Sequence, residues 1–226
     1  MYLDTASGPD AVSIADVGTS LLMNARADSA SARTVCSHGQ AMGAGLAVIP
    51  HGVSLEDESA PSHFDAICDL IALMTSIGRD RAPYKADPLP TGIGISIATK
   101  IAHRKRPALI PIFDNDAIFT LFLREPQAQN AVGEASRPFV MRGLDAIRNA
   151  LIDPQSELAW AEIARVEPRW TRLECFDAVW WVHSEPARRK LRQAREKRPV
   201  RQEKCYFVAD GLCPHACVGT TPRNPE

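Results

Sequence analysis

The chain has 226 residues, of which 45% are hydrophobic and 23% are charged, and its formal net charge is −1. This composition is typical of a folded globular protein and excludes an intrinsically disordered one. No apolar run reaches the roughly 18 residues that a membrane-spanning helix requires, and no basic segment followed by an apolar one opens the chain. We therefore expect no membrane segment and no secretory signal. The six cysteines are then expected to be reduced thiols in a cytoplasmic protein.

Charge is distributed unevenly along the chain. Residues 1–186 carry 16 basic and 23 acidic side chains, whereas residues 187–226 carry 10 basic and 4 acidic ones. Helical propensity stays high after residue 185, but the apolar periodicity disappears. The pattern predicts a helical domain over 1–184, followed by a basic helical extension and a poorly ordered tail over 185–226. The extension is either a solvated helix or a non-specific nucleic-acid arm.

Hydrophobic periodicity predicts an all-α protein, a bundle of about seven helices. The first helix begins after Ser13, which can cap it together with Asp16, and its predicted buried stripe contains Ile14 and Val17 as well as Leu21 and Leu22. Residues 25–62 are predicted as a long loop with a short ordered piece at 44–49. The other predicted helices cover 62–77, 93–103, 114–123, 138–152, 157–166 and 173–183, with a turn-rich connection over 80–90 and an extended run over 108–113.

One short segment points toward a chemistry. Gly92 and Gly94 form a Gly-x-Gly turn before an apolar helix, and Asp114 follows an apolar run twenty residues after Gly94. Glycine accepts positive φ and, lacking a Cβ, lets a phosphate approach the backbone, while a helix N-terminus offers unpaired N–H groups. This order could place the Asp114 carboxylate beside a hairpin that grips a nucleic-acid backbone.

The same segment resembles the helix-hairpin-helix DNA glycosylase superfamily. The similarity rests on Pro90-x-Gly92-Ile93-Gly94-x-x-x-Ala98 and Pro111-Ile112-x-Asp114. It implies a glycosylase-like core in which the two glycines hold DNA and Asp114 lies in the base-excision pocket, where it stabilises an oxocarbenium-like sugar and helps a water attack. Bifunctional members have a lysine two residues after the second glycine, where this chain has Ser96, so the implied activity is monofunctional. No iron–sulfur cysteine set is present at the expected spacing, and no cofactor is predicted.

A second resemblance covers more of the chain. Residues 98–114 resemble the signature of an uncharacterised bacterial domain family, Lys-Leu-Leu-x-Arg-Lys-Arg-Pro-x-Leu-Ile-Pro-Val-Tyr-Asp. Residues 173–183 resemble the second signature of that family. The match runs from about residue 12 to residue 184 and implies no particular activity.

Basic side chains gather near the end of the helix predicted over 93–103. Their nearness to the glycine turn predicts phosphate contacts. The alternative is a solvated helix end whose cations complement the helix dipole, with Lys100 paired to Asp114 or Asp177 as a buried bridge. Asp114 itself has an alternative role as an ordinary helix N-cap. The predicted nucleic-acid contacts are Gly92, Gly94, Lys100, His103, Arg104, Lys105 and Arg106.

Three further features receive structural interpretations. Asp177 lies among apolar and aromatic residues, so we expect it either to pair with a base from 100–106 or to have a raised pKa. Trp180 and Trp181 point about 100° apart on a helix, so one should pack in the core and the other at its edge, in preference to a base-stacking role. The spacing of Cys205, Cys213, His215 and Cys217 is not that of a typical zinc site, and no metal is predicted.

Two functional hypotheses follow. The first is a protein that binds double-stranded DNA and has monofunctional base-excision activity, with Asp114 as the catalytic carboxylate. The second is a non-catalytic helical interaction module that keeps the fold without the chemistry. The acidic charge of residues 1–186 favours the second, because most DNA-binding domains are basic.

Overall fold

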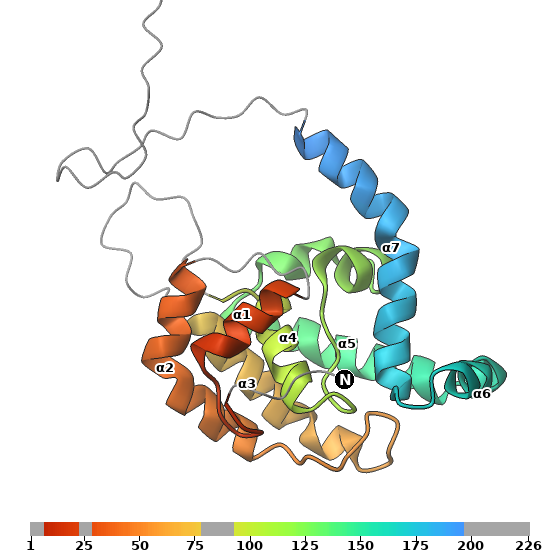
Figure 1. Ribbon diagram of the computed structural model, residues 1–226, viewed down its shortest axis with the longest axis horizontal. Coiled ribbons are helices and arrows are strands. Elements are labelled where there is room, and N and C mark those ends of the chain that lie inside the picture. The colour runs from red at the N-terminus through yellow and green to blue at the C-terminus, as the bar shows by residue number, and fades with distance from the viewer. Residues whose placement is uncertain (1–6, 23–28, 78–92, 197–226) are drawn as a thin grey trace, which may run out of the picture. The chain divides into compact units, whose positions relative to one another are not determined.

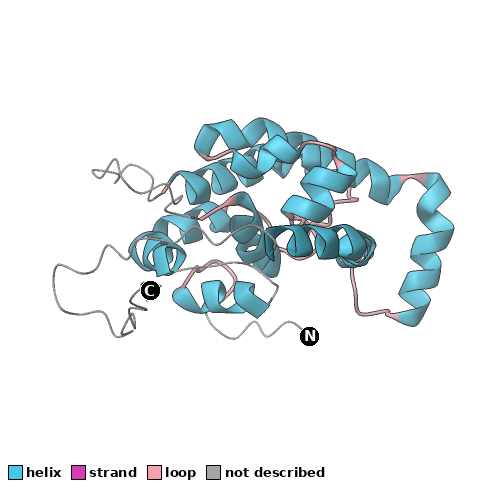
Figure 2. Ribbon diagram, turned by 90° about the horizontal axis from the view of Figure 1, so that it is seen from above, coloured by secondary structure: helices cyan, strands magenta, loops and turns pink. Residues whose placement is uncertain are grey.

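The computed structural model describes residues 7–22, 29–77 and 93–196 (Figure 1). All regular structure in these ranges is helical and none of it is strand (Figure 2), which confirms the all-α prediction. The chain divides into two units, Met1–Arg188 and Arg189–Glu226. The second unit is described only where it contains the end of the last helix, so the fold below is that of the first unit. The tail predicted after residue 196 lies outside the described residues.

Among the residues described, the predicted helices occur in the predicted order, with one α-helix added near the N-terminus and four short helices added between the longer ones. Those predicted over 62–77, 138–152 and 157–166 are confirmed, and the one predicted over 93–103 is displaced by two residues. The α-helices are α1 (Ile14–Leu22), α2 (Ser29–Ala47), α3 (Phe64–Ser76), α4 (Ile95–Lys105), α5 (Arg137–Ile152), α6 (Glu157–Val166) and α7 (Arg172–Glu196). The shorter elements are η1 (Ala60–His63), η2 (Asn115–Phe122), η3 (Pro126–Asn130), η4 (Gly133–Ser136) and η5 (Pro154–Ser156).

Helix α3 is the centre of the hydrophobic core. It packs against α2, α4 and α5, and against the short helices η1 and η4. Its amphipathic stripe is buried as its spacing predicts, and so is the stripe of α5, each such side chain contributing about 1.5–3 kcal/mol by leaving water. The buried side chains on the two helices include Phe64, Ile67, Ile71, Met74, Val140, Leu144, Ile147 and Leu151.

Helix α1 begins with the predicted reciprocal cap. The Ser13 hydroxyl accepts from the Ala15 N–H at 3.2 Å, and the Ser13 N–H donates to Asp16 Oδ2 at 2.8 Å. The predicted buried stripe is wrong at Ile14, which is 55% exposed, while Val17 is buried as predicted. Asp16 and Ser20 take the inner face instead, because α1 packs against the basic end of α4. The side chains of Leu21 and Leu22 lie outside the described residues.

The loop predicted over 25–62 is wrong, because half of it is the 19-residue helix α2. Most residues of α2 are small, and its buried apolar side chains are too few to form a periodic pattern. Gly39 and Gly43 let α2 approach the backbone of residues 10–12 closely: a Cβ on Gly43 would lie 2.7 Å from the Asp10 carbonyl oxygen. The helix is therefore selected by its close packing and not by a strong amphipathic pattern.

The C-terminal helix is longer than predicted. α7 opens with a reciprocal cap, in which the Thr171 N–H donates to Glu174 Oε2 at 2.8 Å and the Glu174 N–H donates to the Thr171 hydroxyl at 3.1 Å. It runs on to Glu196, into the segment of high helical propensity. Trp180 packs against the core and Trp181 is exposed at its edge, as expected.

Within the described ranges, no helix is both long enough and apolar enough to cross a membrane. Cys36, Cys68 and Cys175 carry free thiols. The connection predicted over 80–90, with the Gly92 half of the glycine turn, lies outside the described residues. The helix-hairpin-helix core therefore stays a prediction.

Candidate functional site

Asp114 caps the helix that follows it. Its Oδ1 accepts from the N–H groups of Asp116 at 3.0 Å and Ala117 at 2.9 Å, which confirms the N-cap alternative. The capped helix η2 is a π-helix, in which the Thr120 hydroxyl also donates to the Asn115 carbonyl five residues back. The cap uses one carboxylate oxygen, and the side chain is half-buried.

Gly94 occupies the N-cap position of α4 with φ −83° and ψ 165°, a conformation open to any residue. Gly94 therefore does not use the positive φ that glycine can adopt. A Cβ at Gly94 would meet no atom within 4 Å. The absence of a side chain at Gly94 leaves open space beside the N-terminus of α4. The nearby Thr99 hydroxyl joins α4 to the extended segment before Asp114 by accepting from the Phe113 N–H at 3.1 Å.

The basic end of α4 is turned into the protein. Arg104 Nη1 lies 3.4 Å and Lys105 Nζ 3.0 Å from Asp16 Oδ1, and all three side chains are almost fully buried. Lys105 Nζ also donates to the Ser7 hydroxyl and the Gly8 carbonyl, both at 2.9 Å. The alternative of a solvated helix end is therefore wrong.

Arg106 is the most thoroughly bonded side chain in the described fold. Its guanidinium donates five hydrogen bonds, which equals the number of N–H donors it has. The acceptors are four backbone carbonyls and the Asp10 carboxylate, and the guanidinium joins α2 and the N-terminal segment to the end of α4. The five contacts are with Ile49 O at 2.6 Å, Pro9 O at 3.0 Å, Lys105 O at 2.9 Å, Leu46 O at 2.8 Å and Asp10 Oδ1 at 2.5 Å.

Lys100 and His103 are buried on the same helix. His103 Nδ1 lies 2.7 Å from the Ile110 carbonyl oxygen. Because a carbonyl oxygen can only accept, Nδ1 carries the ring proton and donates a hydrogen bond to that oxygen. Burial lowers the pKa of His103 below its ordinary value, although the Ile110 hydrogen bond and the charge of Glu174 act in the opposite direction. The imidazole is therefore neutral near pH 7, with the lone pair on Nε2.

Asp177 has the raised pKa that was one of its two predicted outcomes. Burial raises the pKa of Asp177 well above its ordinary value, the Ile112 N–H opposes this, and the charges of Glu174 and Asp114 add to it. Its Oδ2 lies 3.8 Å from His103 Nδ1 and 3.3 Å from the Ile112 backbone nitrogen. Burial therefore favours the neutral form of both side chains in this contact.

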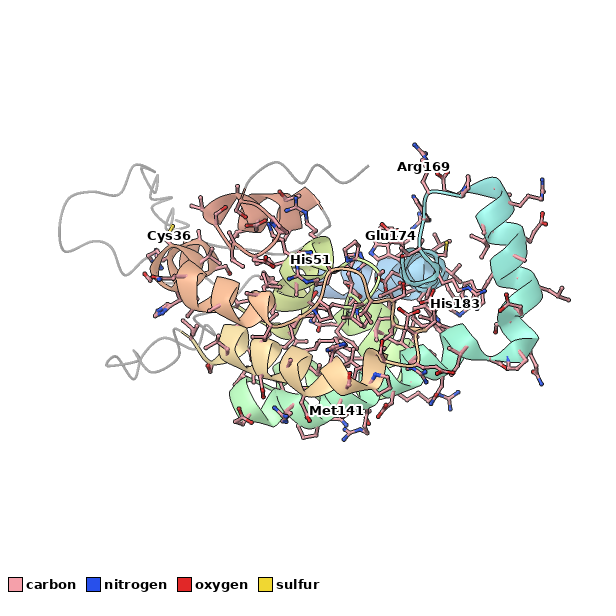
Figure 3. The ribbon with its side chains drawn as sticks, turned by 90° about the horizontal axis from the view of Figure 1, so that it is seen from below. Cys36, His51, Met141, Arg169, Glu174 and His183 are labelled. Carbon is pink, nitrogen blue, oxygen red and sulfur yellow. The ribbon has the colours of Figure 1, made fainter. Side chains whose placement is uncertain are left out.

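A cleft of about 710 Å³ opens beside the basic end of α4. Its other side comes from the start of α7 and the loop before it, and from the loop after α2. Figure 3 shows Arg169, Glu174 and His51 on these segments. Asp114 is not among the lining residues, which are Pro9, His51, His103, Arg104, Lys105, Pro107, Arg169, Trp170, Thr171 and Glu174.

Comparison with known proteins places the chain in a family. The model of a family of unknown function, DUF6308, matches residues 3–184. The chain belongs to the DUF6308 family. No curated protein and no solved structure matches it. The DUF6308 match ends inside the first unit and includes every residue that lines the cleft.

Sequence patterns alone do not indicate some residues of this site. Asp16 was assigned only to a helix cap, yet it also neutralises the buried cations of α4. No sequence motif contains His51 or Trp170, because each lies in an irregular segment and comes to line the cleft only through the tertiary fold. The predicted basic cluster of residues 103–106 does lie together in the structure. Its side chains form a buried network within the protein.

Proposed function

We propose that this protein is a non-catalytic helical interaction module. The observation that supports the proposal is the internal use of its charged residues: Asp16 and Asp10 engage the cations at the end of α4, and Asp114 is used as a cap. These side chains stabilise the fold where they lie. In that arrangement they hold the N-terminal segment and α2 against α4.

The surface that such a module would use is the outer side of α6. This helix has no buried residue, and Figures 1 and 3 both show it at the edge of the first unit. Leu158 is 85% exposed and Val166 is 68% exposed. Apolar side chains gathered on an exposed helix are a frequent mark of protein contacts.

A second copy of the chain is the partner that fits α6. The acidic side chain of its first turn is Glu157, and the basic one of its last turn is Arg165. An antiparallel pair of α6 helices would bring Leu158 near Val166 of the second copy, while Glu157 and Arg165 keep their contacts with Arg172 and Glu162 of the same chain. Such a contact is self-complementary, as a two-fold interface requires.

Sedimentation velocity on the full chain tests this proposal. We expect a concentration-dependent dimer in the wild-type protein and a monomer in Leu158→Glu, because a charge would be buried in the contact. Gln127→Glu is the control, since it adds the same charge at an exposed position on η3. A wild-type protein that stays monomeric at every concentration, or a Leu158→Glu protein that still dimerises, would contradict the proposal.

DNA binding with monofunctional base excision is the second candidate function. It is favoured by the exposed indole of Trp170 in the cleft, on which a base can stack, and not by Arg104 and Lys105, which already contact Asp16. Filter binding of double-stranded DNA across a salt series tests it, because phosphate contacts make affinity fall steeply with ionic strength. Base release would have to be lost in Asp114→Asn, and an unchanged rate in that variant would remove the enzymatic hypothesis.

A further inference from the structure

The cleft beside α4 has the features of a small-molecule site that the proposed function leaves unused. Its volume of about 710 Å³ falls within the range of roughly 300–1,000 Å³ that such sites occupy. Three kinds of group line it: a buried histidine, an exposed tryptophan and several charged side chains. Each restricts the ligand that can fill the cleft.

The buried histidine presents an acceptor. His103 Nδ1 donates to the Ile110 carbonyl, which fixes the tautomer and leaves the lone pair on Nε2. Within the part of the chain that the structure describes, Nε2 makes no hydrogen bond, and His103 lines the cleft while being almost fully buried. The ligand must therefore supply an N–H or O–H donor at this point.

The tryptophan presents a flat apolar surface. Trp170 is 44% exposed, lines the cleft, and stacks on no other ring among the described residues. A planar aromatic ring placed against the indole would bury apolar area on both faces and gain stacking energy.

The arginine and lysine side chains of the lining, and His51, already have carboxylate partners. Arg104 and Lys105 contact Asp16, Arg169 contacts Glu167, and His51 contacts Asp10. Glu174 adds a negative charge to the lining. A ligand with a large net charge would have to break one of these pairs, so the cleft favours an uncharged molecule.

We propose that the cleft binds an uncharged, planar heteroaromatic molecule whose ring N–H donates to His103 Nε2 while the ring stacks on Trp170. The site takes a molecule of one or two fused rings with room for a polar substituent. Binding involves no covalent step and does not require Asp114.

Isothermal titration calorimetry of the full chain with benzimidazole and 1-methylbenzimidazole at pH 8 tests the donor. Both probes are flat and uncharged at that pH, and only the first has a ring N–H. We expect benzimidazole to bind about three- to tenfold more tightly, as the loss of one hydrogen bond predicts. Equal affinities would overturn the role of His103, and no binding of benzimidazole would overturn the site. Benzoate is the third probe, and tighter binding of this anion would overturn the preference for an uncharged ligand.

Two surface variants test the stacking. Trp170→Ala should weaken benzimidazole binding at least about fivefold. Trp181→Ala is the matched control, because Trp181 has a similar exposure of 41% but does not line the cleft. An unchanged affinity in Trp170→Ala, or an equal loss in both variants, would contradict the assignment. These measurements do not depend on self-association through α6, so the two proposals can fail separately.

Discussion

The pKa values of two buried carboxylates of the first unit, Asp16 and Asp177, shift in opposite directions. For Asp16, burial raises the pKa, but hydrogen bonds from Ser7, the Ser13 N–H and Lys105, together with the Lys105 charge, bring it below the ordinary value. For Asp177, burial raises the pKa, and its single hydrogen bond from the Ile112 N–H does not offset this. The number of donors around each carboxylate, and not its burial alone, decides its charge.

The raised pKa of Asp177 predicts a pH-dependent stability. Between the pKa of the unfolded chain and the higher pKa of the folded one, the unfolded state ionises first, so stability falls as the pH rises through that interval. Asp177→Asn removes this loss and keeps an oxygen for the Ile112 N–H. We expect a melting temperature about 3 °C higher at pH 7, which corresponds to about 1 kcal/mol in a domain of this size. The difference should disappear near pH 3.

Thermal unfolding followed by circular dichroism at the two pH values measures this effect. Asp145→Asn on α5 is the control, because Asp145 is exposed. A variant that melts at the wild-type temperature at both pH values would show that Asp177 is ionised in the folded protein.

At the scale of elements, α2 shows how packing can select a helix. Its glycines have low helix propensity, yet Gly39 and Gly43 lie where α2 meets the backbone of residues 10–12. A Cβ on Gly39 would clash with the Val12 carbonyl group. The close approach of α2 to the N-terminal segment therefore requires glycine at both positions.

Substitutions of glycine by alanine should have opposite effects on α2 and α1. Gly39→Ala is expected to destabilise the fold by about 1–3 kcal/mol, because backbone cannot move aside as a flexible side chain can. Gly18→Ala on α1 should be neutral or stabilise by up to about 1 kcal/mol, since a Cβ there meets no atom within 4 Å. Urea unfolding of both variants measures the two changes, and an equal effect of both would refute the close approach of α2.

At the scale of the whole first unit, one buried charge network joins distant parts of the chain. The end of α4 binds Asp16 on α1, the Asp10 segment, and the carbonyls at the end of α2. These contacts span about ninety residues of sequence, from Asp16 to Lys105. Through these contacts the N-terminal segment is packed into the fold of the first unit.

Removing one member of this network should lower the free energy of unfolding substantially. Asp16→Asn leaves the cations of Arg104 and Lys105 without the charge of their shared carboxylate, and we expect a loss of about 3 kcal/mol at pH 7. Because the folded pKa of Asp16 is lowered, its contribution is complete above the unfolded pKa and disappears as the pH falls through the folded value. The difference between the variant and the wild type should therefore begin to shrink below the unfolded pKa of about 4, and disappear below the lower folded value.

Urea unfolding at pH 7 and pH 3 measures this convergence. Asp65→Asn is the control, because Asp65 is 77% exposed and its contact with Arg137 should contribute less than about 1 kcal/mol. An Asp16→Asn protein as stable as the control at pH 7 would refute the network.

The sequence by itself determined the helices whose apolar spacing is regular, such as α3 and α5, and the cap of α1. These features depend on neighbours within one turn, so they can be predicted from local patterns. It also predicted the Asp114 cap and the raised pKa of Asp177, each as one of two alternatives. Only the tertiary structure decided where the charges of residues 103–106 point, that α2 is a helix, and that His51 and Trp170 share a cleft with His103. Those outcomes depend on residues far apart in the sequence, since a basic helix end becomes buried only when carboxylates and carbonyls from other elements surround it.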